Sequence, residues 1–284
     1  MSDATTHERT IESEIVTDFK DRMSYGSYLQ LDRVLSAQVP ISTPEHHDEM
    51  LFIIQHQTSE LWLKLMRHEL LSARALIAND ELQPALKRIA RVKHIQRQLT
   101  EQWSVLATLT PTEYAQFRGF LGNASGFQSY QYRAVEFLLG NKNAGMLKVF
   151  ESQPEAHELL AQLLEEPSVH DEFLRYLARH GHDVPKSVLE RDVTQGYSFC
   201  AELVDTFHVV YENPEEYWLE YETCEEFVDL EDNFQLWRFR HVKTVLRIIG
   251  TKRGTGGSSG VGFLQKALDL TFFPELFAVR TEIG

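Results

Sequence analysis

Apolar residues recur at helical spacing along most of the chain. In one segment they fall three or four residues apart, at Leu189, Val193, Tyr197, Cys200, Val204, Phe207 and Tyr211. This spacing brings them to one face of a helix, and no convincing run alternates as a strand does. The pattern predicts helices over 44–78, 81–109, 111–121, 128–139, 152–165, 168–180, 187–211 and 224–249. We therefore expect an all-α, single-domain bundle of long helices.

Local signals mark several ends of these helices. The order Thr43-Pro44 predicts a start with the proline in the first helical position. Thr110 and Glu113 have the spacing of a capping box, which predicts a second start. Glycines that favour a helix stop follow four of the predicted helices, at Gly122, Gly140, Gly181 and Gly250.

Charge and cysteine content exclude several function classes. The 284 residues include 42 acidic and 28 basic ones, which gives a net charge of −14. Such a surface repels phosphate backbones and argues against nucleic-acid binding. Two cysteines are too few for a disulfide framework or a four-sulfur metal site. The order Cys-x-x-Cys-His does not occur, so a covalently attached c-type haem is excluded.

The first twenty residues are charged and have no apolar core, so they do not fit a signal peptide. We expect residues 1–20 to be disordered and residues 21–284 to form the helical domain. No stretch approaches the roughly 20 apolar residues of a membrane span. We expect a cytoplasmic protein without a membrane or nucleic-acid partner.

Two histidines are the main candidates for chemistry. His241 falls four residues after Trp237 and four before Val245, within the apolar stripe of its predicted helix. Periodicity alone favours a hydrogen-bonded core histidine there; if it binds a metal, the aromatic setting suits haem better than zinc. His56 follows Phe52 by one helical turn, in a polar run that fits a solvated face or polar network as well as a site.

Two further features could bind an anion. Tyr114 and Arg118 are four residues apart on a short predicted helix, a natural carboxylate clamp or simply a surface arginine stacked on a tyrosine. Residues 254–260, with the sequence GTGGSSG, follow a helix and lack the third glycine of a dinucleotide fingerprint. This stretch reads as a flexible linker or as a loop that closes over a ligand.

Six longer strings occur in order from about residue 20 to the end of the chain. They are SYGSYL at 24–29, FIIQHQ at 52–57, ELW at 60–62, GNASGFQS at 122–129, WRFRH at 237–241 and GTGGSSG at 254–260. Together they resemble the tryptophan 2,3-dioxygenase family. The resemblance implies a haem-dependent enzyme that opens the indole C2–C3 bond of L-tryptophan with O2. The product would be N-formyl-L-kynurenine, in the first step of the kynurenine pathway.

The resemblance also implies the cofactor and its surroundings. Each subunit would enclose one non-covalent b-type haem that works with ferrous iron. His241 would be the axial ligand of the haem iron, and Trp103 and Ser125 would lie near the haem.

For the indole ring of the substrate, the resemblance implies a pocket on the helix of His56. This histidine would accept the hydrogen bond of the indole N–H, and Phe52 would pack on the ring, with neighbours at Ile53, Ile54 and Gln55. We expect neutral His56 to orient the substrate and not to act as an obligatory base.

For the amino-acid end, Arg118 would pair with the carboxylate with the help of Tyr114. Thr255 would contact the ammonium or carboxylate group, and its loop would close over the substrate. The family also implies a homotetramer in which an N-terminal segment is exchanged between subunits. Tyr25, Tyr28 and Leu29 of one subunit would then complete the pocket of a neighbour.

Three other interpretations remain at this point. A related dioxygenase with broader indoleamine specificity would also turn over tryptamine, which lacks the carboxylate. A haem sensor or storage bundle would bind haem without consuming O2 in response to tryptophan. A helical interaction protein would bind no cofactor.

Overall fold

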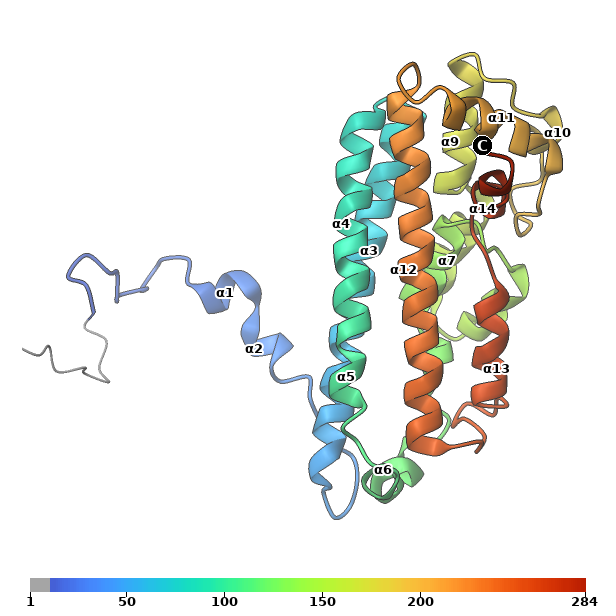
Figure 1. The fold of residues 1–284 in the computed structure, drawn as a ribbon. Coiled ribbons are helices and arrows are strands. Elements are labelled where there is room, and N and C mark those ends of the chain that lie inside the picture. Colours follow the sequence, from blue (N-terminus) through green and yellow to red (C-terminus); the bar gives the residue numbers. More distant parts are fainter. Residues whose placement is uncertain (1–10) are drawn as a thin grey trace, which may run out of the picture. The chain divides into compact units, whose positions relative to one another are not determined.

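The computed structural model describes residues 11–284, and within them the chain divides into two units, one ending at Val39 and one beginning at Pro40 (Figure 1). All regular elements are helical, and no strand occurs in the described residues, which confirms the all-α prediction. The predicted disorder of residues 1–20 falls partly outside the described range, and the boundary at residue 20 stays a prediction.

The first unit has little core of its own. It holds two short helices, α1 (Tyr25–Leu29) and α2 (Leu31–Val34), neither of which contains a buried residue. Ser24 caps α1, and its hydroxyl accepts the backbone N–H of Ser27 at 3.2 Å. Apolar side chains of this unit are exposed, among them Tyr25 at 76% and Tyr28 at 73%.

Three long helices form the frame of the second unit. They are α3 (His47–Ala78), α4 (Leu82–Glu101) and α12 (Trp218–Ile249), and α4 packs on both α3 and α12 (Figure 1). The other face of α3 packs on α7 (Tyr130–Leu138) and α9 (Val169–Arg179). Buried apolar side chains of these helices make one continuous core, and each such Leu, Ile or Phe contributes about 1.5–3 kcal/mol.

Shorter helices complete the unit. They are α5 (Trp103–Leu106), α6 (Pro111–Arg118), α8 (Pro154–Glu165), α10 (Lys186–Leu189), α11 (Ala201–Glu212), α13 (Val261–Lys266) and α14 (Pro274–Ala278), with 3-10 turns at 119–121, 126–128, 144–150, 267–269 and 279–281. The predicted capping box of α6 is present, because the Thr110 side chain accepts from the Glu113 N–H and Glu113 accepts from the Thr110 N–H. Helix α12 ends at Gly250, whose φ of 62° favours glycine.

The single helix predicted over 187–211 is wrong. Helix α10 ends at Leu189, and α11 begins only at Ala201. Polar contacts hold the intervening loop: Arg191 donates to the carboxylate of Asp171 and to the carbonyls of Asp192 and Gln195. These contacts outweigh a helical pattern that is continuous in the sequence.

Two other predicted boundaries need correction. The helix expected from Pro44 begins at His47, because Ser42 and Glu49 organise the preceding residues as a loop. The Glu49 carboxylate accepts the N–H groups of Ile41 and Ser42 at 2.9 and 3.1 Å, and the Ser42 hydroxyl accepts that of His46. The helix expected over 81–109 is interrupted at Gln102, which separates α4 from α5.

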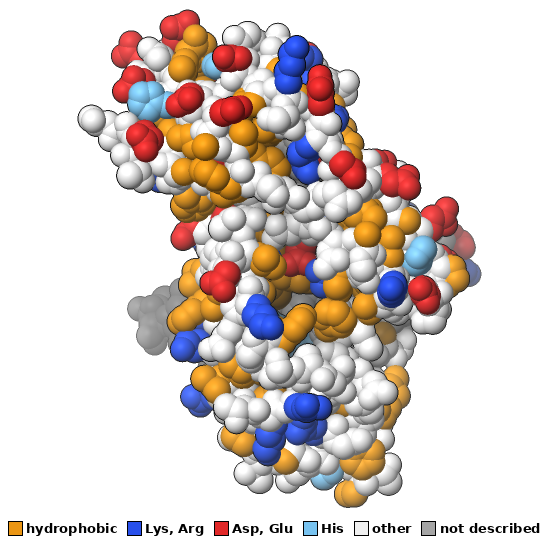
Figure 2. All heavy atoms as spheres, turned by 90° about the vertical axis from the view of Figure 1, so that its right-hand side faces the viewer, with side chains coloured by type: hydrophobic (Ala, Val, Ile, Leu, Met, Phe, Trp, Pro, Cys, Tyr) orange, Lys and Arg blue, Asp and Glu red, His pale blue; other side chains and the backbone are white. Residues whose placement is uncertain are grey.

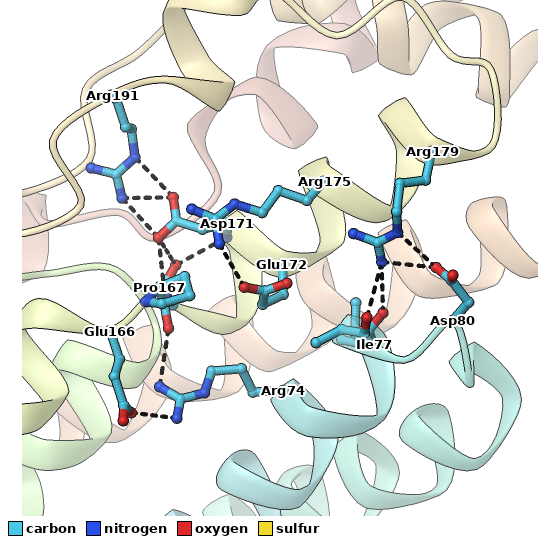
Figure 3. A network of polar contacts seen from close by, with 12 residues as sticks. Arg74, Ile77, Asp80, Glu166, Pro167, Asp171, Glu172, Arg175, Arg179 and Arg191 are labelled. Carbon is cyan, nitrogen blue, oxygen red and sulfur yellow. Dashed lines mark hydrogen bonds and ion pairs between the residues drawn. The ribbon is translucent and has the colours of Figure 1, made fainter.

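A network of ion pairs joins α3 to α9 and to the loop after α10 (Figure 3). Arg74 on α3 donates to Glu166 and to the Pro167 carbonyl, just before α9 begins. Arg191 grips both carboxylate oxygens of Asp171, at 2.8 and 2.9 Å. Because both partners are largely buried, this bidentate pair holds the pKa of Asp171 below its usual range against the opposing effect of burial.

Acidic and basic side chains are unevenly distributed over the face shown in Figure 2. Acidic groups gather on its upper part, whereas Lys and Arg dominate the lower part, at the height where α6 and the end of α12 lie in Figure 1. An anion therefore meets an attractive local field there in spite of the net charge of −14. Within residues 11–284, no helix is both long and apolar enough to cross a membrane.

Candidate active site

Helix α3 brings Phe52 and His56 together, one turn apart. Their ring centroids are 4.1 Å apart, and the Nδ1 atom of His56 lies 2.7 Å from the Phe52 carbonyl oxygen. Because a carbonyl oxygen can only accept, Nδ1 carries the proton and Nε2 keeps a free lone pair. Burial lowers the pKa of His56, and the hydrogen bond to Phe52 opposes this only in part. His56 is therefore a neutral ring that offers one acceptor.

Helix α12 supplies the second histidine. The His241 ring stacks on Trp103 with a centroid distance of 4.7 Å and an interplanar angle of 10°, and Trp237 lies 5.6 Å away. Burial, and to a smaller extent the charge of a protonated His56, lower the pKa of His241 to about 4. The two imidazoles thus lie within electrostatic reach of each other, and His241 is uncharged at neutral pH.

The surroundings of His241 fit a haem. The indole N–H groups of Trp103 and Trp237 are buried and have no hydrogen-bond partner within the described residues, so both can donate to a bound group. In the same range, no set of three His, Cys, Asp or Glu side chains could hold a bare metal ion. A lone neutral imidazole in an aromatic setting instead suits an iron that already has four porphyrin nitrogens.

A cavity of about 420 Å³ lies beside α6 and the end of α12. Its walls include two cationic side chains, two hydroxyl groups and an apolar side, from Pro111, Tyr114, Ala115, Arg118, Gly119, Gly122, Ile248, Ile249, Lys252 and Thr255. The Arg118 guanidinium lies close enough to the Tyr114 hydroxyl to influence its pKa, so the two side chains four residues apart share one face of α6. Burial raises the pKa of Tyr114 and the Arg118 charge opposes the rise, so the hydroxyl keeps its proton.

Aromatic contacts connect the histidine pair to this cavity. Phe52, which stacks on His56, lies 5.7 Å from Tyr114 and 5.6 Å from Phe117, measured between ring centroids. Phe117 is fully buried in a small apolar cluster with Trp103, Leu106, Leu109 and Ile248. This closely packed cluster supports the rings of Phe52 and Tyr114, which lie between the imidazole of His56 and the guanidinium of Arg118.

The glycine loop lies against residues 123–125. The Thr255 hydroxyl donates to the Ala124 carbonyl at 2.5 Å, and the guanidinium of Arg118 donates to the Arg253 carbonyl at 2.5 Å. Gly256 permits this approach, because a Cβ atom there would lie 2.7 Å from the Cβ atom of Ser125. Two polar groups of the cavity, those of Arg118 and Thr255, are thus bonded to backbone carbonyls of the chain itself.

The other predicted site residues are not among those that the contacts above bring together. Ile54 is 44% exposed, and Gln55 is buried beside Ser59, whose hydroxyl donates to the Gln55 carbonyl. Relative to Phe52 on the helix, Ile53 is turned by about 100° and Ile54 by about 160° in the opposite sense, whereas Gln55 is turned by only about 60°. Tyr25, Tyr28 and Leu29 belong to the first unit, whose position relative to the second is not defined.

Some site residues were not among those predicted. The pattern assigns Trp237 only to the apolar stripe, yet its place four residues before His241 already predicts a shared face. Lys252, Ile248 and Ile249 line the cavity, and nothing in their local pattern distinguishes them from ordinary helix-end residues.

Fold and site together define a class: an all-helical protein with two neutral histidines in an aromatic setting and a nearby cavity lined by cationic side chains. Comparison with known proteins narrows this class. A family model for tryptophan 2,3-dioxygenase matches residues 12–208 and 201–283. Proteins named tryptophan 2,3-dioxygenase from Kineococcus radiotolerans and Serratia proteamaculans are 71% and 60% identical over 276 and 278 residues. These alignments cover 97% and 98% of this chain and 96% and 99% of the relatives. The chain belongs to the tryptophan 2,3-dioxygenase family.

Proposed function

We propose that this chain cleaves the indole C2–C3 bond of L-tryptophan with O2 to give N-formyl-L-kynurenine. One observation carries the proposal beyond family membership: the uninterrupted path from His56 through Phe52 and Tyr114 to Arg118. Its order matches tryptophan, which has an indole N–H, an apolar bicycle and a carboxylate. A substrate that lacked any one of the three would leave one of these groups without a partner.

His241 would hold a ferrous b-type haem as its axial ligand, one per subunit. Its neutral state suits this role, because only an unprotonated imidazole nitrogen can bind iron. The free N–H groups of Trp103 and Trp237 would serve polar substituents of the haem or water beside it. Ser125, one residue after the carbonyl that Thr255 contacts, would lie at the haem edge. When bound, the haem supplies the activation of O2.

The chain's own residues would bind and orient the indole ring. The Nε2 atom of His56 accepts the indole N–H, since Nδ1 is committed to the Phe52 carbonyl. Phe52 packs on the bicycle and excludes water from it, with Ile53, Ile54 and Gln55 supporting the same helical turn. Held at both ring and nitrogen, the C2–C3 bond cannot rotate away from the reacting centre. This role requires an acceptor at His56 but no proton transfer to it.

Arg118, Tyr114 and Thr255 would hold the amino-acid end. Arg118 would leave the Arg253 carbonyl for the substrate carboxylate, and Thr255 would leave the Ala124 carbonyl for the ammonium or carboxylate group. The Tyr114 hydroxyl keeps its proton and donates beside Arg118. This exchange of partners would draw the loop 254–260 over the ligand.

We further propose a homotetramer in which Tyr25, Tyr28 and Leu29 complete a neighbouring subunit's pocket. The support is their exposure and the absence of any buried residue in α1 and α2. A segment with exposed aromatic side chains and no core of its own needs a surface to cover.

The test is the absorption spectrum of the ferrous, haem-loaded protein in air, before and after L-tryptophan is added. We expect a Soret band and a new near-ultraviolet band of the formylkynurenine product. A Soret band without product would leave a haem sensor or storage protein. No Soret band after haem addition would remove His241 as an axial ligand and overturn the proposal.

A further inference from the structure

Gln102 lies at the interruption between α4 and α5, and its side chain reaches across to α3. Its amide oxygen accepts the Thr58 hydroxyl at 3.2 Å, and its amide nitrogen donates to the Ser59 hydroxyl at 2.7 Å. All three side chains are half-buried and uncharged. We call these three residues the clasp.

On α3 the clasp is bonded to the backbone carbonyls of the two residues that precede His56. The Thr58 hydroxyl lies 2.9 Å from the Ile54 carbonyl oxygen, and the Ser59 hydroxyl donates to the Gln55 carbonyl at 2.8 Å. These carbonyls belong to the helical turn that carries His56, whose own Nδ1 is bonded to the Phe52 carbonyl. A shift of the clasp therefore shifts this turn.

On α5 the clasp is one residue away from the ring that contacts His241. The residue after Gln102 is Trp103, whose buried ring stacks on the His241 imidazole at 4.7 Å. One amide side chain thus connects the helix of His56 with the ring that supports His241. Because hydrogen bonds are directional, this contact fixes the position of α3 relative to the start of α5. Apolar packing alone would define that position less sharply.

We propose that Gln102 is a positioning residue, which fixes the separation of His56 from His241 and thereby how strictly the site demands an indole N–H. The inference rests on the proposed function and concerns no contact of Gln102 with the ligand. The consequence is a preference for ligands with an indole N–H. If the helical turn of His56 can shift, the Nε2 atom of His56 no longer meets the indole N–H at a defined place. The preference for L-tryptophan over 1-methyl-L-tryptophan, which has no indole N–H, should then fall.

The experiment compares wild type with Gln102→Leu, which keeps the size of the side chain and removes both hydrogen bonds. Each ferrous, haem-loaded protein is titrated anaerobically with L-tryptophan and with 1-methyl-L-tryptophan, and binding is followed by the shift of the Soret band. The dissociation constant of 1-methyl-L-tryptophan divided by that of L-tryptophan measures the preference. We expect this ratio to fall by about fivefold in the variant, which corresponds to the free energy of one net hydrogen bond. Affinity for the methylated ligand should change little.

Gln98→Leu is the matched control, because it makes the same chemical change one helical turn earlier at an exposed position and should keep the wild-type ratio. Ser59→Ala removes one of the two bonds of Gln102, together with the Ser59 bond to the Gln55 carbonyl, and leaves the bond of Gln102 to Thr58 in place. A smaller fall in the ratio is therefore expected, and this variant serves if Gln102→Leu does not fold. An unchanged ratio in a folded clasp variant overturns the inference. So does an equal weakening for both ligands, which indicates general destabilisation. If wild type itself binds neither ligand, the proposed function fails instead.

Discussion

Two histidines of this chain have a pKa that burial lowers to about 4, yet their surroundings differ. His170 on α9 is only 1% exposed and makes edge-on contacts with Tyr197, Phe227 and Phe273. His241 on α12 is partly accessible, stacks on Trp103 and lies within the field of a second histidine. A perturbed pKa therefore occurs both inside a closed core and at a site.

The two regions differ in how accessible the histidine ring is and in whether the polar groups around it have hydrogen-bond partners. Around His170, ion pairs such as Asp171 with Arg191 are bonded within the chain, and aromatic rings fill the remaining space. Around His241, two indole N–H groups have no partner among the described residues. The nearby cavity is lined by cationic side chains, among them Arg118, whose guanidinium donates to a backbone carbonyl. Both ring nitrogens of His170 are also buried without a hydrogen-bond partner among the described residues, but that ring is only 1% exposed. The unpaired indole groups around His241 instead lie beside a ring that is partly accessible to a ligand.

The strongest test of this contrast removes His241. We expect His241→Ala to lose the Soret band at haem concentrations that saturate wild type, because alanine offers no atom that can replace the axial ligand. His170→Phe is the matched control and should bind haem normally. The comparison breaks down if the two variants lose haem to the same extent.

The second test uses pH and reads stability. The pKa of His170 in the folded chain, about 4, is below the unfolded value near 6.5, so the unfolded state takes up its proton first. The stabilising effect of neutral His170 is thus present above pH 6.5 and lost as the pH falls toward 4, by about 3 kcal/mol in all. Asp171 and Arg191 are the charged groups beside it, and their effects oppose each other. His170→Phe should show a smaller fall in Tm over this range; a curve parallel to wild type would contradict it.

The third test concerns the guanidinium of the open region. Arg118→Ala should weaken L-tryptophan binding by about 2 kcal/mol, roughly 30-fold, because the carboxylate loses its charged partner at a half-exposed position. Affinity for tryptamine, which has no carboxylate, should change far less. Isothermal titration with both ligands separates the two outcomes, and a wild-type affinity for L-tryptophan would exclude the clamp.

The smallest expected effect is at the loop. In Gly256→Ala the added Cβ would lie 2.7 Å from the Cβ atom of Ser125, so the loop must move away from residues 123–125. We expect KM for L-tryptophan to rise about threefold to tenfold while Tm changes little, since the loop is not part of the core. Gly257→Ala would be a poor control because of the positive φ there, whereas Gly126→Ala meets no atom within 4 Å. An equal rise in both variants would argue against a specific contact.

Much of this arrangement follows from the sequence, for identifiable reasons. Helices such as α12 bury an apolar stripe with a period of 3.6 residues, and that stripe contains His241 and Trp237. The loop after α10 escapes such a prediction because its stability comes from Arg191 and Asp171, twenty residues apart, which no local pattern reports. The same holds for Gln102, whose partners on α3 are 43 and 44 residues away.

The site itself is identified through long strings that resemble one family more than through periodicity. Spacing places Phe52 beside His56 and Tyr114 beside Arg118, and both pairs are in contact. It could not show that Phe52 also contacts Tyr114, since the two lie on different helices. Long-range packing of this kind decides which candidate residues form one site.

The bonds of Arg118 and Thr255 to backbone carbonyls also have a calorimetric consequence. With the proposed roles of Arg118 and Thr255, ligand binding would be an exchange, in which two internal hydrogen bonds break as new ones form. The heat released should therefore be small for a ligand with so many polar groups, and much of the favourable free energy should come from water released from the indole ring. The protein would hold its ligand by a difference between two nearly balanced sets of bonds.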